Sequence, residues 1–87
     1  MASVSLPLIL TDVTGGDRQM EVAGDTLAEI VSALELLYPG IEARICQGEA
    51  IRHTLAFVVD GKIAARGLQT PVSPQSEINV LPAMGGG

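Results

Sequence analysis

The last residues of this 87-residue chain contain its most distinctive chemistry, a backbone carboxylate at the end of a run of glycines. After Leu81 the sequence reads Pro82-Ala83-Met84-Gly85-Gly86-Gly87, and residues 78–87 contain no ionisable side chain. The carboxylate of Gly87 is therefore the sole charge expected there. Because glycine has no side chain and the greatest backbone freedom, we expect this tail to protrude from the domain. At about 3.3 Å per residue it could extend on the order of 20 Å, far enough to enter the active site of another protein.

Other residues with chemical potential are scattered along the chain, and each has a plain structural interpretation. The single cysteine, Cys46, follows Ile45 and is predicted to be a small apolar filler. His53 has no Cys, Asp or second His at ligand spacing, so we expect a solvated loop residue and no metal. Gly15-Gly16 is not followed by the Gly-Lys-Ser/Thr of a phosphate loop, which favours a turn. Without an acid–base pair, metal cluster or phosphate loop, the domain is predicted not to be an enzyme.

Composition excludes several classes of protein. Ten acidic residues against five basic ones give a net charge of −5, and the aromatic residues are Tyr38 and Phe57 alone. Nucleic-acid binding needs clustered cations and stacking platforms, so no nucleic-acid partner is expected. We expect no membrane segment, and the start Met1-Ala2-Ser3 is unlike a signal peptide, which together with the single cysteine predicts a cytoplasmic protein. The acidic balance favours partners with basic patches, which would speed encounter.

The hydrophobic periodicity predicts one small α+β domain. Apolar residues at every second position indicate strands, and an apolar stripe from Leu27 to Tyr38 indicates an amphipathic helix. Thr26 and Glu29 form a capping pattern at its start, and Pro39-Gly40 ends it. The predicted elements are strands at 4–10 and 18–22 joined by a turn at 14–17, a helix at 26–38, a short helix at 41–45, a surface loop at 47–50, strands at 55–59 and 62–65 joined by Asp60-Gly61, an irregular stretch at 67–76, and a strand at 77–81. Such an order lays the helix across a sheet whose other face stays partly open.

A strand that leads directly into a bare glycine end, on a small α+β domain, resembles the ubiquitin-like β-grasp sulfur carriers of the ThiS, MoaD and CysO group. The run 80–87 matches the end of those proteins without a gap, with Gly85 where they usually carry Ala or Ser. The resemblance implies a β-grasp fold, with a mixed sheet of four to five strands packed on one main helix. It also implies a domain at 1–82 and a flexible tail at 83–87. The segments most similar to the CysO branch are Val4-Ser5-Leu6-Pro7, Ile9-Leu10, Thr14-Gly15-Gly16, Gly24-Asp25-Thr26-Leu27, and Tyr38 with Gly40-Ile41.

The same resemblance implies a function for the tail. In such carriers a ubiquitin-activating-type enzyme uses ATP and magnesium to adenylate the terminal carboxylate, and a sulfur donor then displaces AMP. Gly87 would thus become a thiocarboxylate that donates sulfur in the biosynthesis of cysteine, a cofactor or a natural product. Met84, Gly85 and Gly86 would be bound by the partner, and the domain itself would hold no cofactor. Partners are expected to recognise the open sheet face, where we place Phe57 and Leu81, although both also fit the core.

Two other functions fit the same ending. A ubiquitin-like modifier would be joined through Gly87 to lysines of target proteins, and only Lys62 could extend a lysine-linked chain of copies. The small subunit of molybdopterin synthase would perform the terminal chemistry inside a permanent complex, with a large apolar interface. A free carrier, in contrast, is expected to be a monomer. An interaction module with an incidental tail is the third alternative.

Overall fold

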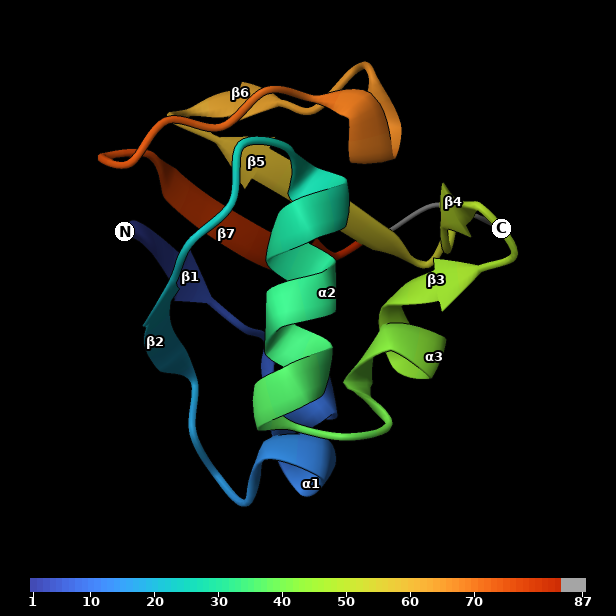
Figure 1. Ribbon diagram of the computed structural model, residues 1–87. Helices are drawn as coiled ribbons and strands as arrows, with labels where there is room; N and C mark the ends of the chain where they lie inside the picture. The colour runs from blue at the N-terminus through green and yellow to red at the C-terminus, as the bar shows by residue number, and fades with distance from the viewer. Residues whose placement is uncertain (84–87) are drawn as a thin grey trace.

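The computed structural model describes residues 1–83 and contains a five-stranded mixed sheet (Figure 1). The sheet has the strand order β2-β1-β7-β5-β6. The first and last strands, β1 and β7, lie side by side and run parallel, whereas the other neighbours are antiparallel. The strand that leads into the tail is therefore the central one. The bounds are β1 Ala2–Ser5, β2 Gln19–Val22, β5 Leu55–Val59, β6 Lys62–Ile63 and β7 Glu77–Pro82.

Helix α2, Leu27–Leu37, crosses one face of this sheet (Figure 1), and it confirms the predicted helix to within one residue at each end. The Thr26 hydroxyl accepts a hydrogen bond from the Glu29 N–H at 3.3 Å, and the Glu29 carboxylate accepts one from the Asp25 N–H at 2.8 Å. These contacts satisfy amides that the first turn leaves free. Tyr38 has left the helical conformation, with φ −133° and ψ 82°, and Gly40 adopts a φ of 102° beyond the helix.

The predicted strand at 4–10 is wrong in its second half. β1 ends at Ser5, and the chain then forms a 3-10 turn at Leu8–Leu10 (η1) and helix α1, Thr11–Thr14. Pro7 has no N–H for a strand ladder, and instead its carbonyl accepts from the Leu10 N–H at 3.1 Å. Leu10 therefore turns into the core, whereas Leu8 and Ile9 project into solvent. β1 and β2 do pair antiparallel, but through this helical connection and not through a tight hairpin.

The remaining elements follow the prediction closely. Helix α3 spans Ile41–Ile45 as expected, and Asp60 and Gly61 close the β5–β6 hairpin with φ values of 53° and 84°. Around the predicted surface loop the chain forms a two-stranded ribbon that extends one residue beyond the loop at each end, and within the predicted irregular stretch it forms one 3-10 turn. Those elements are β3 Cys46–Gln47, β4 Ala50–Ile51 and η2 Gly67–Gln69.

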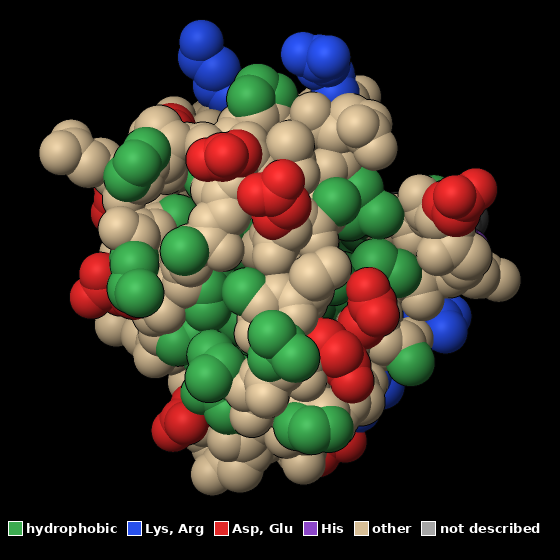
Figure 2. All heavy atoms as spheres, in the orientation of Figure 1, with side chains coloured by type: hydrophobic (Ala, Val, Ile, Leu, Met, Phe, Trp, Pro, Cys, Tyr) green, Lys and Arg blue, Asp and Glu red, His purple; other side chains and the backbone are tan. Residues whose placement is uncertain are grey.

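A core of aliphatic side chains and Phe57 fills the space between α2, α3 and the inner face of the sheet. Ile78 and Val80 point into it from β7, as the alternation predicts, and α2 covers it. Figure 2 shows the outer side of this helical layer, where acidic side chains lie among hydrophobic ones. Among residues 1–83, no helix is long and apolar enough to cross a bilayer. Because α2 covers one face, the opposite face of the sheet stays available for contacts.

Two carboxylates accept hydrogen bonds at turns of this fold, and we predict that they make its stability depend on pH. Glu35 accepts the N–H groups of Gly40 at 2.9 Å and Glu42 at 2.8 Å, and these hydrogen bonds hold its pKa below the usual 4.5. Asp60 accepts the Glu77 N–H at 2.9 Å and the Ser76 hydroxyl at 2.8 Å, which lower its pKa below 3.8. Both groups stabilise the fold above their ordinary pKa, and this contribution is lost as pH falls through the lowered folded values.

The melting temperature is therefore expected to decrease as the pH drops below about 4.5. This decrease should be less steep in a Glu35→Gln, Asp60→Asn double variant. Calorimetry or circular dichroism between pH 7 and pH 3 measures this. Glu49→Gln is the control, because within residues 1–83 that carboxylate makes no side-chain hydrogen bond. An equal pH dependence in the double variant and the native chain would contradict the assignment.

Candidate functional site

The open face of the sheet changes from polar to apolar along β7, the strand that precedes the tail. Side chains alternate on β7, so Asn79 and Leu81 lie on the face opposite Ile78 and Val80. Asn79 stands between Ser5 of β1 and Val58 of β5, and Leu81 stands beside Ala56. Leu81 is 46% exposed. The face is therefore apolar toward the end of β7, where the tail begins.

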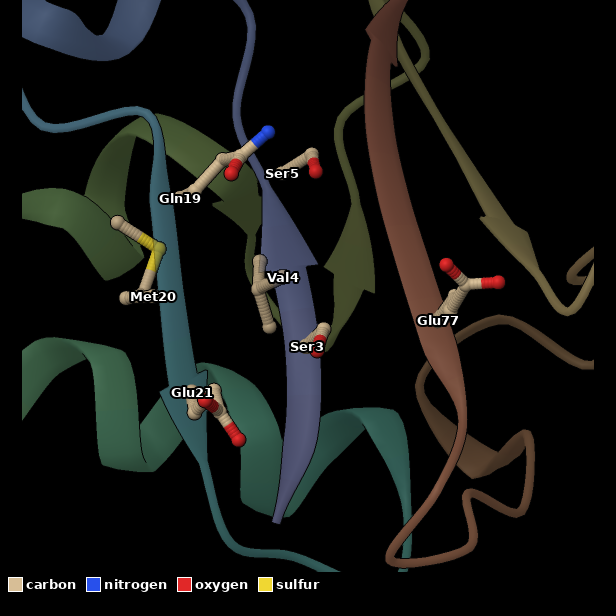
Figure 3. Close-up of a pocket in the computed structure, with 7 residues that line it drawn as sticks. All are labelled: Ser3, Val4, Ser5, Gln19, Met20, Glu21 and Glu77. Atoms are coloured by element: carbon tan, nitrogen blue, oxygen red, sulfur yellow. The ribbon is translucent and has the colours of Figure 1, made fainter.

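At the start of β7 the same face is polar and acidic (Figure 3). The strand register places Ser3 between Glu21 of β2 and Glu77 of β7. These residues, with Ser5 and Gln19, line an open hollow of about 470 Å³. Two carboxylates thus mark the end of the sheet farther from the tail.

A second hollow, of about 350 Å³, lies at the point where β7 ends. Its rim carries Leu8, Ile9 and Leu81, which are 68%, 52% and 46% exposed, and we call these three residues the tail-root patch. The hollow is completed by Ser5, Leu6, Pro7, Arg18, Asn79, Val80 and Pro82. Large apolar side chains that gather around one hollow are typical of a protein contact surface.

The polypeptide is held to the sheet up to the last described residue. Pro82 pairs with Leu55, and the Ala83 N–H donates to the Thr54 carbonyl at 2.8 Å. Ala83, which the sequence analysis assigned to the tail, is thus attached to the domain by a backbone hydrogen bond. The last strand is thus paired to its end, and Pro82 there lines the hollow of the tail-root patch.

The two expected contact residues of the body have opposite positions. Leu81 is exposed in the tail-root patch, whereas Phe57 is only 2% exposed and opposes Val80 on the core side of the sheet. The placement of Phe57 on the open face is therefore wrong, because the β5 alternation sends it inward together with Leu55 and Val59. The four predicted tail residues, Met84, Gly85, Gly86 and Gly87, lie outside the described residues.

Sequence reasoning missed Leu8 and Ile9 as surface residues. It assigned them to a strand, where every second residue would be buried. Pro7 was the signal that could have found them, because a proline interrupts a strand ladder and often precedes a helical turn. The 3-10 turn presents both side chains to solvent.

The other candidate residues behave as structural elements. Cys46 is half-buried against the core, and burial raises the pKa of its thiol, with the nearby Glu42 charge acting in the same direction. His53 is exposed. In the part of the chain that the structure describes, no three His, Cys, Asp or Glu side chains gather where they could hold a metal ion. Among the described residues, the apolar and charged surfaces of the body are thus the candidate site.

Comparison with known proteins places this arrangement in a family. The ThiS family model matches residues 5–87. The chain belongs to the ThiS family. The sulfur carrier protein CysO of Mycobacterium tuberculosis is 34% identical over 90 residues, which cover 98% of this chain and 97% of the relative. CysO of Mycobacterium bovis matches to the same extent.

Solved structures of this ThiS-family branch agree. The structure of the BexX/CysO complex of Amycolatopsis orientalis matches with a TM-score of 0.91 and 31% identity, covering 100% of both chains. Mycobacterium tuberculosis CysO gives a TM-score of 0.88 and 29% identity over 97% of this chain and 100% of that one. The protein is a ubiquitin-like β-grasp domain of the CysO branch, and its homology supports a role as a sulfur carrier.

Proposed function

We propose that this protein carries sulfur as a thiocarboxylate on Gly87 and hands it to a biosynthetic enzyme. The observation that carries the proposal is the near-full-length match to CysO sulfur carriers, together with the ThiS family match that runs to Gly87. The exposed tail-root patch at the end of the central strand supports it, since it offers an enzyme a surface next to the reactive end. The acceptor would make cysteine, a cofactor or a sulfur-containing natural product.

The chemistry needs two steps because a carboxylate is a poor electrophile. An oxygen of the Gly87 carboxylate attacks the α-phosphorus of ATP, pyrophosphate leaves, and an acyl-adenylate forms. A sulfur donor at the oxidation level of sulfide then attacks the carbonyl carbon, and AMP leaves with the oxygen that carried the phosphoryl group. ATP and magnesium belong to a ubiquitin-activating-type partner. The carrier contributes the carboxylate and the surfaces by which it is recognised.

In this scheme the partner enzymes bind the folded body of the carrier. Leu8, Ile9 and Leu81 would pack against the activating enzyme and the sulfur acceptor, while the residues beyond Ala83 enter their active sites. Apolar side chains at the centre of a contact carry much of its binding energy. That a CysO relative has been solved in a complex with BexX supports contact between this chain and a partner enzyme.

Intact mass spectrometry of the protein from its native cell tests the proposal. Replacement of one oxygen by sulfur is expected to add about 16 Da to a fraction of the molecules, and alkylation of the thiocarboxylate should remove that species. Size-exclusion chromatography is expected to show a monomer. A stable larger subunit would favour the molybdopterin synthase alternative, and adducts through Gly87 to lysines would favour a protein modifier. Absence of the sulfur-bearing species under sulfur-replete growth would overturn the proposal.

Structural neighbours do not favour either alternative. SAMP1 of Haloferax volcanii, a small archaeal modifier protein, is 24% identical with a TM-score of 0.74, and a putative molybdopterin converting factor subunit of Pyrococcus furiosus is 13% identical. Such distant likeness shows the shared fold alone. Lys62, the single lysine, lies exposed on β6.

A further inference from the structure

We propose that the groove lined by Arg52 beside the tail root binds an acidic segment of the protein that receives the tail. This inference rests on the proposed carrier function, and it adds the kind of partner surface that the body fits. It concerns a surface that adjoins the tail-root patch and shares Ile9 with it. Overall net charge alone predicts the opposite polarity, a basic partner.

The groove is an open hollow of about 350 Å³ lined by Ile9, Leu10, Ala43, Arg44, Arg52, Thr54 and Leu55. Ile9 also lines the hollow of the tail-root patch, so the two surfaces share a wall. The Thr54 carbonyl holds the Ala83 N–H at 2.8 Å. A protein that receives the tail must therefore approach the groove.

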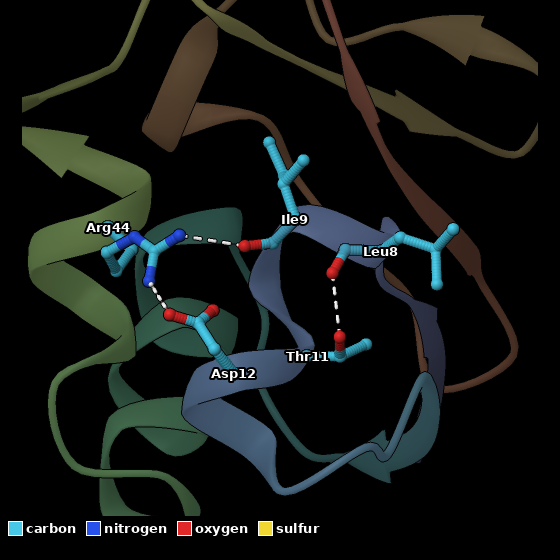
Figure 4. Close-up of polar contacts among 5 residues, drawn as sticks. All are labelled: Leu8, Ile9, Thr11, Asp12 and Arg44. Carbon is cyan, nitrogen blue, oxygen red and sulfur yellow. Dashed lines mark hydrogen bonds and ion pairs between the residues drawn. The ribbon is translucent and has the colours of Figure 1, made fainter.

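The two arginines of the groove differ in what their guanidinium groups contact. Arg44 donates to the Asp12 carboxylate and to the Ile9 carbonyl, both at 2.7 Å (Figure 4). Its charge is thereby matched within the molecule. Arg52 donates from Nε to the Ala43 carbonyl at 3.1 Å and has no ion-pair partner among residues 1–83. Its guanidinium is thus anchored on one side, and within residues 1–83 its two terminal nitrogens make no hydrogen bond.

Charge is distributed unevenly around the tail root. Of the five basic residues in this chain of net charge −5, three line the two adjoining hollows, namely Arg18, Arg44 and Arg52. No Asp or Glu of the described residues lines either hollow, and the Asp12 carboxylate is paired with Arg44. The open sheet face instead carries its carboxylates, Glu21 and Glu77, at the other end (Figure 3). Because Asp12 matches the charge of Arg44, Arg18 and Arg52 are the residues that make the tail root cationic on an anionic molecule.

A carboxylate side chain is the ligand that best fits this surface. An anchored guanidinium offers a planar pair of N–H donors that matches the two oxygens of a carboxylate. Ile9 and Leu55 add an apolar wall, which a peptide can cover and a small inorganic anion cannot. Attraction between the cationic tail root and an acidic segment of the partner would also orient the carrier during encounter. The acidic end of the sheet would be repelled by the same segment.

Solution NMR of the full chain with hexaglutamate as the probe tests the inference. We expect shifts of the Ala43, Arg52 and Thr54 amides and of the Arg52 Nε–H, which weaken as salt rises. Arg52→Gln is expected to weaken this binding about fivefold, the upper range for an exposed charge pair. Arg66→Gln, which removes an exposed arginine near β6, is the matched control and should change nothing.

Three outcomes would overturn the inference. These are no shifts around Arg52, the same shifts with hexaglutamine, or equal shifts with inorganic phosphate at matched ionic strength. The sulfur-bearing species of the native chain, measured by intact mass in the same cells, separates this result from the fate of the carrier proposal. If that species forms while hexaglutamate leaves the groove unchanged, only the acidic-partner inference fails. If hexaglutamate binds but the sulfur-bearing species never forms, the carrier proposal fails, whereas the groove is still shown to bind an acidic peptide.

Discussion

Deletion of Gly86 and Gly87 is expected to abolish the sulfur-bearing species completely while leaving the melting temperature within about 2 °C of the native value. The reactive carboxylate would then belong to Gly85, two residues too short to reach the activating site in the proposed mechanism. Stability should survive because glycine contributes no side chain to a core, and the core described here lies between Ala2 and Val80. Intact mass spectrometry and circular dichroism measure the two effects.

Gly85→Ala is the control for this deletion. The family resemblance implies that alanine or serine is usual at that position, so the variant is expected to load sulfur at close to the native level. A truncated chain that still acquired the extra mass would show that the reactive group is not the terminal carboxylate. Loss of folding in the truncated chain would show that the last glycines support the domain.

Substitutions at two neighbouring positions of the sheet are expected to have opposite consequences. Phe57→Ala should destabilise the domain by about 3–5 kcal/mol, because it removes the largest side chain of the β5 inner face and leaves a cavity. For a domain of this size the melting temperature should fall on the order of 20 °C. Leu81→Ser, on the exposed side of β7, should change the melting temperature little but lower sulfur loading about tenfold, as expected for one central contact residue.

Leu36→Ser is the matched control for Leu81→Ser. Leu36 is 85% exposed on α2, which covers the other face of the sheet from Leu81. Its substitution therefore makes the same chemical change on the opposite side of the molecule. It should alter neither stability nor loading. Equal loading in the Leu81 and Leu36 variants would remove the tail-root patch from the proposed contact surface, and a stable Phe57→Ala protein would contradict the packing of the core.

The elements with regular local patterns could be predicted, and those with competing patterns could not. Helix α2 has a capping pair, an uninterrupted apolar stripe and a proline stop, so all local preferences agree. The β5–β6 hairpin is similarly marked by Asp60-Gly61. Residues 4–10 combine a strand alternation with Pro7, and the alternation alone could not show that the chain would turn there into a 3-10 helix.

The sequence by itself determined the class of domain, the helix, the inward face of β7, and the glycine ending, because these depend on residue types and their spacing within one element. Only the tertiary structure decided that Phe57 is buried, that Leu8 and Ile9 join Leu81 around one hollow, and that Arg52 lies beside the tail root. Those relations depend on which strands become neighbours. The parallel pairing of β1 with β7 brings residues more than 70 positions apart into contact, and no local periodicity encodes that choice.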